Sequence, residues 1–245
     1  MKVANGTLTV NSVGGLIDFE GSILGTSDEV LVLNANAASD GDSANEKVIV
    51  AAIGTGNQIH SVSITGRDGI TLEGNITTSN KASNNVSFTG PVSINAATVA
   101  IDTDATGNDG TVTFSSTIDS ATGTSRNLDI VSATGNVTVT GAIGATTALA
   151  SLDINQAGGD GDITLTSNIG ADASNPGVTG VTRIGNAATA DLNLNGTVYS
   201  TDGATTFTAV SGGTIDLGGS SPTFTTSADT ITFGTADVKV ANGTL

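Results

Sequence analysis

Residues 137–165 read VTVTGAIGATTALASLDINQAGGDGDITL and contain one copy of a short pattern and the start of a second. In each copy, two apolar residues alternate with a polar one, and a third apolar residue follows four positions later. Val137, Val139 and Ile143 form the first copy, and Ile163 begins the second. Strict alternation places successive side chains on opposite faces of a β-strand. The stretch therefore predicts short strands that recur at a regular spacing and are separated by glycine-containing turns.

The same pattern occurs along most of the chain. Its copies are Ile17/Phe19/Ile23, Ile70/Leu72/Ile76, Val112/Phe114/Ile118, Val137/Val139/Ile143, Ile163/Leu165/Ile169 and Leu192/Leu194/Val198. The last three steps between copies are nearly equal in length, and we interpret the first two, which are much longer, as double steps. A second alternating stretch follows several copies, at Leu128/Ile130, Leu152/Ile154, Val181/Ile184 and Phe207. No window has the spacing of an amphipathic helix.

Repeats of this length suit a β-solenoid, in which each coil contributes two or three short strands to one narrow shared interior. We therefore predict an all-β fold of about ten coils of roughly 24 residues. The alternative is two β-sandwich domains of roughly 120 residues, which would show a linker near the middle and aromatic anchors in each half. The pattern continues without pause over residues 112–198, and only 3% of the residues are aromatic. The prediction is one continuous solenoid segment over residues 1–245.

The two ends of the chain share a heptapeptide. KVANGTL occupies residues 2–8 and recurs at residues 239–245, a separation of 237 residues. Chance repetition of seven residues in so short a chain is very improbable. We therefore expect a second, longer order of repetition, in which the chain covers one 237-residue period and the start of the next.

Composition narrows the classes of partner. The chain has 7 Lys and Arg against 23 Asp and Glu, a formal charge of −16, so it has no basic surface with which to neutralise phosphates. We expect no nucleic-acid partner. We also expect no membrane insertion, since no run approaches the roughly 18 apolar residues of a spanning helix. The absence of Cys suits an exported bacterial protein.

Four stretches resemble the repeats of very large bacterial surface proteins of the filamentous haemagglutinin and autotransporter-adhesin type. They are TGNVTVTGAIGATTALASLDI (134–154), GTVTFSSTID (110–119), GDITLTSNIG (161–170) and TADLNLNGTV (189–198). The resemblance is clearest from about residue 108 to 200. It implies a right-handed parallel β-helix, an extracellular or cell-surface location, and a role in adhesion or in a matrix.

Three Asp-rich turns are candidates for calcium binding. GGDGD, with Asp160 and Asp162, approaches the nonapeptide whose glycines turn and whose carboxylates coordinate Ca²⁺ between coils. The other two turns hold Asp40 with Asp42, and Asp104 with Asp109. Hard cations require several oxygen ligands and each turn supplies only two or three, so solvated turns are the preferred interpretation. The Asn-x-Ser/Thr sequons at Asn5, Asn75, Asn85, Asn136, Asn195 and Asn242 are likewise interpreted as turn or stacked Asn residues.

An ice-binding surface is one alternative function. Thr113, Thr138 and Thr164 lie between the paired apolar positions of three successive units, and Ser115, Thr140 and Thr166 lie beside them. A flat Thr array on a solenoid can order water. The corresponding positions of other units read Asp18 and Glu20, Thr71 and Glu73, and Asn193 and Asn195, which would interrupt the array.

A polysaccharide lyase or hydrolase is the enzymatic alternative. Such an enzyme would use an acidic cluster with a basic residue, for which Arg67 beside Asp68 and Arg183 are the candidates. His60 lacks a Ser, Cys or second His partner signature, and the chain has no Trp and one Tyr to stack against sugars. We therefore predict a protein that is not an enzyme and has no cofactor apart from a possible calcium ion.

These observations favour a structural or adhesive repeat module of a long surface protein or filament. Each coil buries too few apolar residues to fold alone, so stability must come from stacking on its neighbours. Open coil ends predict head-to-tail self-association. Glycan or protein partners at a cell surface or matrix would contact the strand faces and the longer loops, Ala35–Glu46 and Ala171–Gly180.

Overall fold

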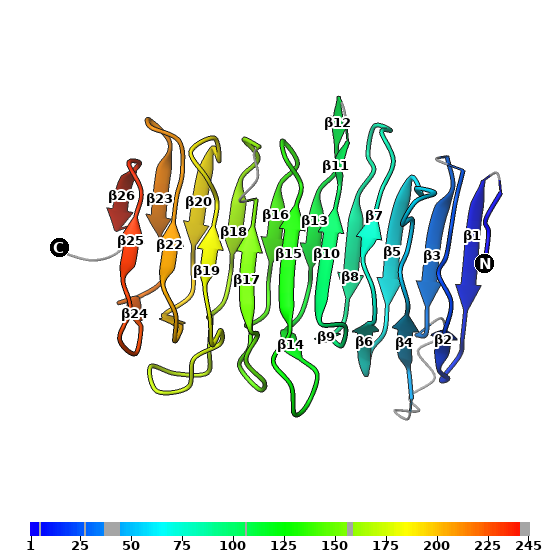
Figure 1. Cartoon of the computed structure of the whole chain (residues 1–245), viewed down its shortest axis with the longest axis horizontal. Helices are drawn as coiled ribbons and strands as arrows, with labels where there is room; N and C mark the ends of the chain where they lie inside the picture. The colour runs from blue at the N-terminus through cyan, green and yellow to red at the C-terminus, as the bar shows by residue number, and fades with distance from the viewer. Residues whose placement is uncertain (5, 27, 37–44, 106, 156–158, 241–245) are drawn as a thin grey trace.

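A computed structural model describes residues 1–4, 6–26, 28–36, 45–105, 107–155 and 159–240. Its regular structure is all-β, in parallel sheets stacked as a β-solenoid of about nine turns (Figure 1). The described residues contain no helix that is long and apolar enough to cross a membrane. The chain advances coil by coil from one end of the molecule to the other, which confirms the predicted fold class and rules out two β-sandwiches.

The longest sheet receives one strand from every coil and is called the long face. Its parallel strands are β1 (Thr7–Asn11), β3 (Val30–Asn34), β5 (Ser61–Thr65), β8 (Val86–Thr89), β13 (Val112–Phe114), β16 (Val137–Val139), β18 (Ile163–Leu165), β20 (Asp191–Leu194), β23 (Thr214–Leu217) and β26 (Asp237–Val240). The pairing keeps strict register, so that Val112 lies beside Val137 and Val137 beside Ile163. Equivalent side chains therefore form columns along the rod axis.

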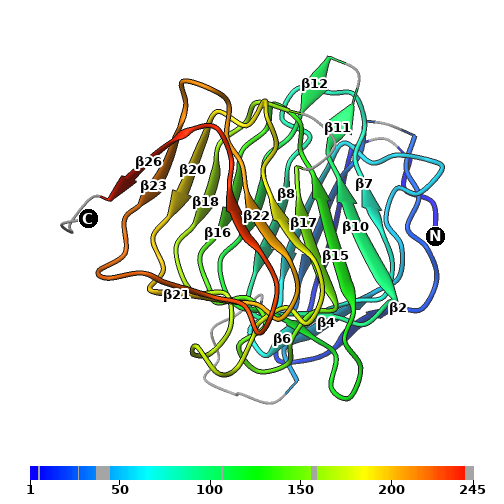
Figure 2. The same cartoon turned by 60° about the vertical axis from the view of Figure 1, so that its left-hand side comes forward.

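Two further faces close each coil, and the three sides are visible in Figure 2. The second face contains β2 (Ile17–Phe19), β4 (Lys47–Val50), β6 (Gly69–Leu72), β9 (Val92–Ile94) and β14 (Ile118–Ser120), and single bridges at Ile143 and Ile169 continue it to β21 (Val198–Ser200) and β24 (Thr223–Thr225). The third face contains β7 (Ile76–Thr77), β10 (Thr98–Asp102), β15 (Asn127–Val131), β17 (Ser151–Ile154), β19 (Thr182–Ile184), β22 (Thr205–Phe207) and β25 (Ile231–Phe233). A short antiparallel hairpin, β11 (Asp104–Ala105) and β12 (Asn108–Asp109), projects from one edge (Figure 1).

The core is a thin column of aliphatic side chains. Between the terminal strands, the inward residues of the long face and of the third face are buried, and the column continues from Leu31 and Leu33 near one end to Ile215 and Leu217 near the other. Aromatic side chains concentrate toward the C-terminal end. Tyr199 stacks on Phe224 with ring centroids 4.8 Å apart, and Phe207 stacks on Phe233 at 5.4 Å. Burial of this kind is shared between coils, so each coil depends on the next.

The repeat pattern marks a corner of the coil. In the copies that begin at Val112, Val137 and Ile163, the paired apolar residues lie on the long face and the third residue begins the second face. In the copy that begins at Leu192, the residue that fills this inward position is Tyr199 and not Val198. The third face also differs by one residue from the prediction, because Thr182 and Ile184 point inward while Val181 is 37% exposed.

The column that the sequence predicts is wrong for two copies of the pattern. Ile17 and Ile70 lie on the second face, where Val48 is in register between them. The step from Ile17 to Ile70 is thus a true double step. The step from Ile70 to Val112 is not, because it passes from the second face to the long face, where Val112 pairs with Val86. Both faces produce the same alternation, so sequence spacing alone could not separate them.

The chain makes about nine turns where ten were predicted, because some coils are longer than average. On the long face, the coil from Leu31 to its partner Val62 includes the predicted loop at residues 35–46 and is therefore long. The coil from Ile163 to its partner Leu192 includes the loop at residues 171–180. Insertions at the corners lengthen individual coils without disturbing the ladder.

The two copies of the shared heptapeptide begin on different faces. Lys2 forms a bridge to Leu24, and the neighbouring Ile23 is bridged through Ile53 to Ile76 of β7, so the first copy begins beside the third face. Lys239 lies within β26 on the long face, beside Asp216. Residues 241–245 of the second copy lie outside the described residues, as does Asn242 of its sequon.

Candidate functional site

A column of Asn and Asp side chains runs along one edge of the long face. Its members, Asn85, Asn136, Asp162 and Asp191, each precede a strand or begin one, and each reaches across to the next coil. The side-chain oxygens of Asn85 and Asn136 accept the backbone N–H of Thr111 and of Asp162, both at 2.9 Å. Asp162 accepts from the Asp191 N–H at 3.2 Å, and Asp191 from the Thr214 N–H at 2.8 Å. We call these four residues the Asx column.

The Asx column explains two of the sequons. Asn85 and Asn136 bind the next coil through their side-chain oxygens, and Asn75 does the same on another corner, where its oxygen accepts the Ala100 N–H at 2.9 Å. Side chains of this kind compete for backbone donors in turns, and here they satisfy donors that the corner leaves unpaired. These contacts are consistent with the interpretation of the sequon Asn residues as stacked turn residues.

The described calcium candidates do not converge on one point. Asp160 is exposed at the turn before β18, while Asp162 belongs to the Asx column. Asp104 lies exposed on β11, and Asp109 on β12 accepts hydrogen bonds from the N–H and hydroxyl of Thr134, at 3.2 and 2.7 Å. Asp40 and Asp42 lie outside the described residues. Among the residues that are described, no group of three or more His, Asp or Glu side chains has the geometry of a metal site.

The long face carries an uninterrupted array of small polar side chains. From β5 to β18, its outward residues are Ser61, Ser63 and Thr65, then Asn85, Ser87 and Thr89, then Thr111, Thr113 and Ser115, then Asn136, Thr138 and Thr140, and then Asp162, Thr164 and Thr166. We call these residues the hydroxyl array. Asp18, Glu20, Thr71 and Glu73, which were expected to interrupt it, belong to or adjoin β2 and β6 on the second face. That expectation is therefore wrong for four of the six residues. Asn193 and Asn195 do lie in the same columns, one coil beyond β18.

Charged side chains gather on the third face instead. Asp129 lies in register beside Asp153, and Asp153 lies beside Arg183, whose guanidinium approaches its carboxylate at 3.3 Å. Burial, and then the charges of Asp153 and Asp102, raise the pKa of Asp129. Burial is also the main cause that raises the pKa of Asp102. This side of the rod therefore has closely spaced carboxylates, one of which, Asp153, is paired with Arg183.

The two candidate catalytic arginines are engaged in separate ion pairs. Arg67 Nε lies 3.1 Å from Oε2 of Glu46, which is fully buried, and 3.9 Å from Asp68. Asp68 in turn accepts the Glu46 N–H at 3.0 Å. Arg67 thus pairs with a buried carboxylate at a corner, while Arg183 pairs with Asp153 on the third face. A buried charge requires such a partner because its desolvation is otherwise very costly.

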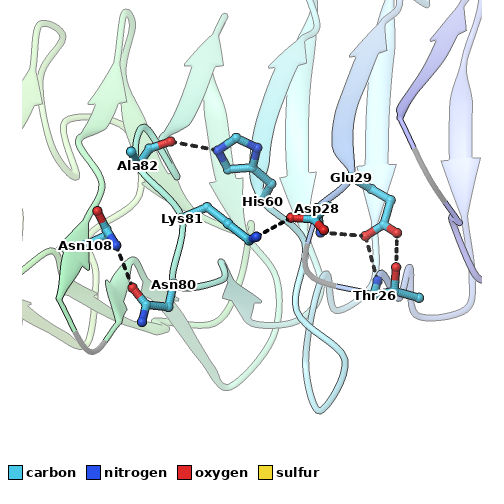
Figure 3. Close-up of polar contacts among 8 residues, drawn as sticks. All are labelled: Thr26, Asp28, Glu29, His60, Asn80, Lys81, Ala82 and Asn108. Carbon is cyan, nitrogen blue, oxygen red and sulfur yellow. Dashed lines mark hydrogen bonds and ion pairs between the residues drawn. The ribbon is translucent and has the colours of Figure 1, made fainter.

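Polar residues also bridge the corners between the third face and the long face near the N-terminal end (Figure 3). Lys81 pairs with Asp28 at 2.7 Å, and the His60 ring contacts the Ala82 carbonyl oxygen through Nε2 at 2.9 Å. Next to these bridges lies a surface cavity of about 410 Å³, lined by Gly25, Thr26, Gly56, Asn57, Gln58 and Thr77.

Sequence reasoning missed this cavity. Its lining residues come from three different coils, and none belongs to the repeated apolar pattern. The signal in the sequence was Glu29, which directly precedes the apolar strand residue Val30. A carboxylate in that position is fully buried in the structure and requires polar partners nearby.

The predicted contact loop at residues 171–180 is organised by its own side chains. Asp172 accepts the backbone N–H of Ser174 at 2.7 Å and the side-chain amide of Asn175 at 2.7 Å. These hydrogen bonds, the backbone one first, hold the pKa of Asp172 below its usual value. Of the other predicted loop, residues 37–44 lie outside the described part of the chain.

Comparison of the chain with protein-family models, with curated proteins and with solved structures finds no match in any of the three. The resemblance to filamentous haemagglutinin and autotransporter adhesins therefore stays a prediction from the sequence.

Proposed function

We propose that the chain is a non-enzymatic structural and adhesive module of an extracellular or cell-surface protein, a rod segment that spans distance and associates end to end. The observation that carries the proposal is the parallel ladder of the long face, which ends at β1 on one side and at β26 on the other among the described strands. Unpaired strand edges are templates for pairing with another chain. Multiple collinear copies would add reach and avidity, whereas a catalytic site gains nothing from such copying.

Apolar side chains at both ends support this association. Near the N-terminal end Val13 is 60% exposed and Leu16 is 49% exposed, and at the C-terminal end Val238 is 40% exposed. Phe224, Ile231 and Phe233 toward the C-terminal end are partly buried. A second copy stacked on either end would cover these groups and pair the free strand edges.

Light scattering over a range of protein concentrations tests the proposal. The wild-type protein should form assemblies whose mass rises with concentration, and Val238→Glu should shift it toward the monomer. Val181→Glu is the matched control, since it makes the same change at a similarly exposed position away from the two ends. Monomers at the highest concentration of the wild-type protein would overturn the end-to-end model. So would an equal response of the two variants.

The non-enzymatic part of the proposal has its own test. Prolonged incubation with acidic polysaccharides such as pectate and alginate should release no unsaturated or reducing ends. Product release that is lost in Arg67→Ala or in Arg183→Ala would replace the structural proposal with an enzymatic one.

A second candidate function is favoured by the hydroxyl array. Because the array continues over five adjacent strands, it forms a field of hydroxyl and amide groups spaced by about 4.8 Å along the rod and roughly 6.6 Å along each strand. Such a field could order water at an ice surface. Asp162 is the one charged side chain in the hydroxyl array, and the Thr residues of the array also present apolar methyl groups. Both properties favour the hydroxyl array over the charged third face as an ice-binding surface.

Thermal hysteresis and ice recrystallisation assays test this second candidate. Thr113→Tyr, on the central strand β13 of the hydroxyl array, should abolish any activity. Thr206→Tyr makes the same change on β22 of the third face and should retain it. A wild-type protein without effect on ice growth would remove the candidate.

A further inference from the structure

The cavity near the N-terminal end is built by turns from successive coils. Gly25 and Thr26 come from the first corner, Gly56, Asn57 and Gln58 from the second, and Thr77 from the third. With a spacing of about 4.8 Å between coils, the cavity extends roughly 10 Å along the rod. Its volume of about 410 Å³ falls within the range of about 300–1,000 Å³ that is common for small-molecule sites.

A buried carboxylate fixes one wall of the cavity. Glu29 is fully buried, and it accepts hydrogen bonds from the Thr26 N–H at 2.6 Å, from the Thr26 hydroxyl and from the Asp28 N–H at 3.2 Å. In later coils the same column is filled by Gly110, Gly135 and Gly161. The first corner therefore has a charged side chain, which holds the turn in place, where those later corners have glycine.

The backbone closes tightly around this carboxylate. A Cβ atom on Gly25 would lie 2.4 Å from the Gln58 carbonyl oxygen and 2.8 Å from Glu29 Oε2, so only glycine fits. The first and second corners are thus in direct contact at the floor of the cavity. A wall with fixed backbone and fixed carboxylate is preorganised, and a ligand would lose little free energy to ordering it.

The rim is tied together by polar bridges, as Figure 3 shows. Lys81 on the third corner reaches Asp28 on the first at 2.7 Å, and His60 Nε2 on the second corner lies 2.9 Å from the Ala82 carbonyl oxygen on the third. Exposed pairs of this kind stabilise the fold little. They do hold the first three corners in one arrangement beside the cavity.

The groups that face the cavity are neutral. The side-chain amides of Asn57 and Gln58 make no hydrogen bond to another described residue, so their donors and acceptors remain available. An amide offers two donors and one acceptor oxygen, which matches the paired donor and acceptor character of sugar hydroxyls. No aromatic or large aliphatic side chain of the described residues lines the cavity, and the formal charge of −16 disfavours anionic ligands.

We propose that this cavity is a binding site for a short neutral glycan, held by Thr26, Asn57, Gln58 and Thr77. The inference rests on the proposed adhesive function for its biological role, because it names the ligand that such a rod would contact. Without an aromatic platform, one site binds weakly, with a dissociation constant on the order of 1 mM. Repeated copies along a filament would compensate through avidity.

Ligand-observed NMR and calorimetry with cellotriose, chitotriose, mannotriose and the anionic trimer of galacturonic acid test the proposal on the full chain. At least one neutral trimer should bind, more tightly than the anionic trimer. The double variant Asn57→Ala, Gln58→Ala should weaken that binding by tenfold or more. Asn193→Ala, which removes an amide from the outer side of β20, should bind as the wild-type protein does.

Three results would overturn the glycan site: no binding of any neutral trimer, equal binding of the anionic trimer, or unchanged binding by the double variant. Circular dichroism melting of each variant verifies that it is folded, and the wild-type measurement stands without any variant. Light scattering on the same samples separates the two proposals. If the protein associates but binds no glycan, only the proposal of the glycan site is wrong. If the protein binds glycan but stays monomeric, only the proposal of end-to-end association is wrong.

Discussion

The Asp162 carboxylate accepts a hydrogen bond from the backbone N–H of Asp191, which lies one coil further along the rod, at 3.2 Å. The same aspartate is one of the six Asp residues that the sequence offers as calcium candidates. One oxygen of this side chain therefore already has a protein partner that does not depend on a metal ion.

Substitutions at Asp162 should separate the two roles. Asp162→Asn keeps an oxygen that can accept the Asp191 N–H, so we expect a melting temperature close to that of the wild-type protein. Asp162→Ala leaves that donor without its partner and should cost about 1 kcal/mol of unfolding free energy. Melting curves recorded with millimolar calcium and with a chelator provide the measurement. A wild-type melting temperature that rises with calcium, and an Asp162→Asn variant that does not respond, would instead establish a calcium site.

Glycine at position 135 is required by close approach of the backbone. A Cβ atom there would lie 2.1 Å from the Gly110 carbonyl oxygen in the neighbouring coil. We expect Gly135→Ala to destabilise the protein by about 1–3 kcal/mol, as overpacking against an unyielding neighbour does. Gly21→Ala is the control, because no atom lies within 4 Å of the added methyl group. Urea denaturation of both variants measures the difference, and equal midpoints would contradict the packing of this corner.

Phe207 connects two coils through its ring contacts. It is fully buried, stacks on Phe233 and meets Tyr199 and Phe224 edge to face, with centroids 5.9 and 5.4 Å apart. Phe207→Ala should lower stability by about 3–5 kcal/mol. Hydrogen exchange should show the loss of protection concentrated in β22–β25, because coils interact with their nearest neighbours. Thr206→Ala, which faces outward on the same strand, should leave that protection intact.

Asp129 should make stability depend on pH. Its pKa in the folded protein is raised by burial and by the charges of Asp153 and Asp102, so the folded state binds the proton more tightly than the unfolded state. Its contribution to stability is therefore fully present below the unfolded value of about 3.9 and is lost as the pH rises through the folded value. We expect Asp129→Asn to stabilise the protein at pH 7 by about 0.5 kcal/mol, through removal of a like-charge cross-strand pair.

That gain should disappear by about pH 3, where the wild-type carboxyl is protonated. Melting temperatures of both proteins from pH 3 to pH 7 measure the effect. Asp153→Asn is the comparison, and it should gain less because it also loses its ion pair with Arg183. A constant difference between wild type and Asp129→Asn at every pH would disprove this account.

The fold could be predicted from the sequence because every coil repeats the same alternation of apolar and polar residues in its strands. Val137 and Ile163 indicate the period, and the structure places them side by side. The identity of each face could not be predicted, because strands of the long face and of the second face have the same inward spacing. Ile70 and Val112 were therefore placed in one column, and this error also assigned Asp18 and Glu73 to the wrong surface.

The candidate site was harder to predict than the fold. The cavity joins residues from three coils, and its position depends on how three corners of unequal length stack, which no local pattern encodes. Likewise, the partners of Asn85 and Asp162 lie a whole coil away, at Thr111 and Asp191, and they become visible only once the register is known.

The direction of the ladder hydrogen bonds has a mechanical consequence. Because they run parallel to the rod axis, a pull on the two ends loads them in tension, one coil at a time, rather than in shear across many bonds at once. The rod should therefore yield by unspooling from an end at low force. Each coil of about 25 residues would release roughly 80 Å of extended chain. A tether of this kind would lengthen stepwise under load and dissipate energy at every step.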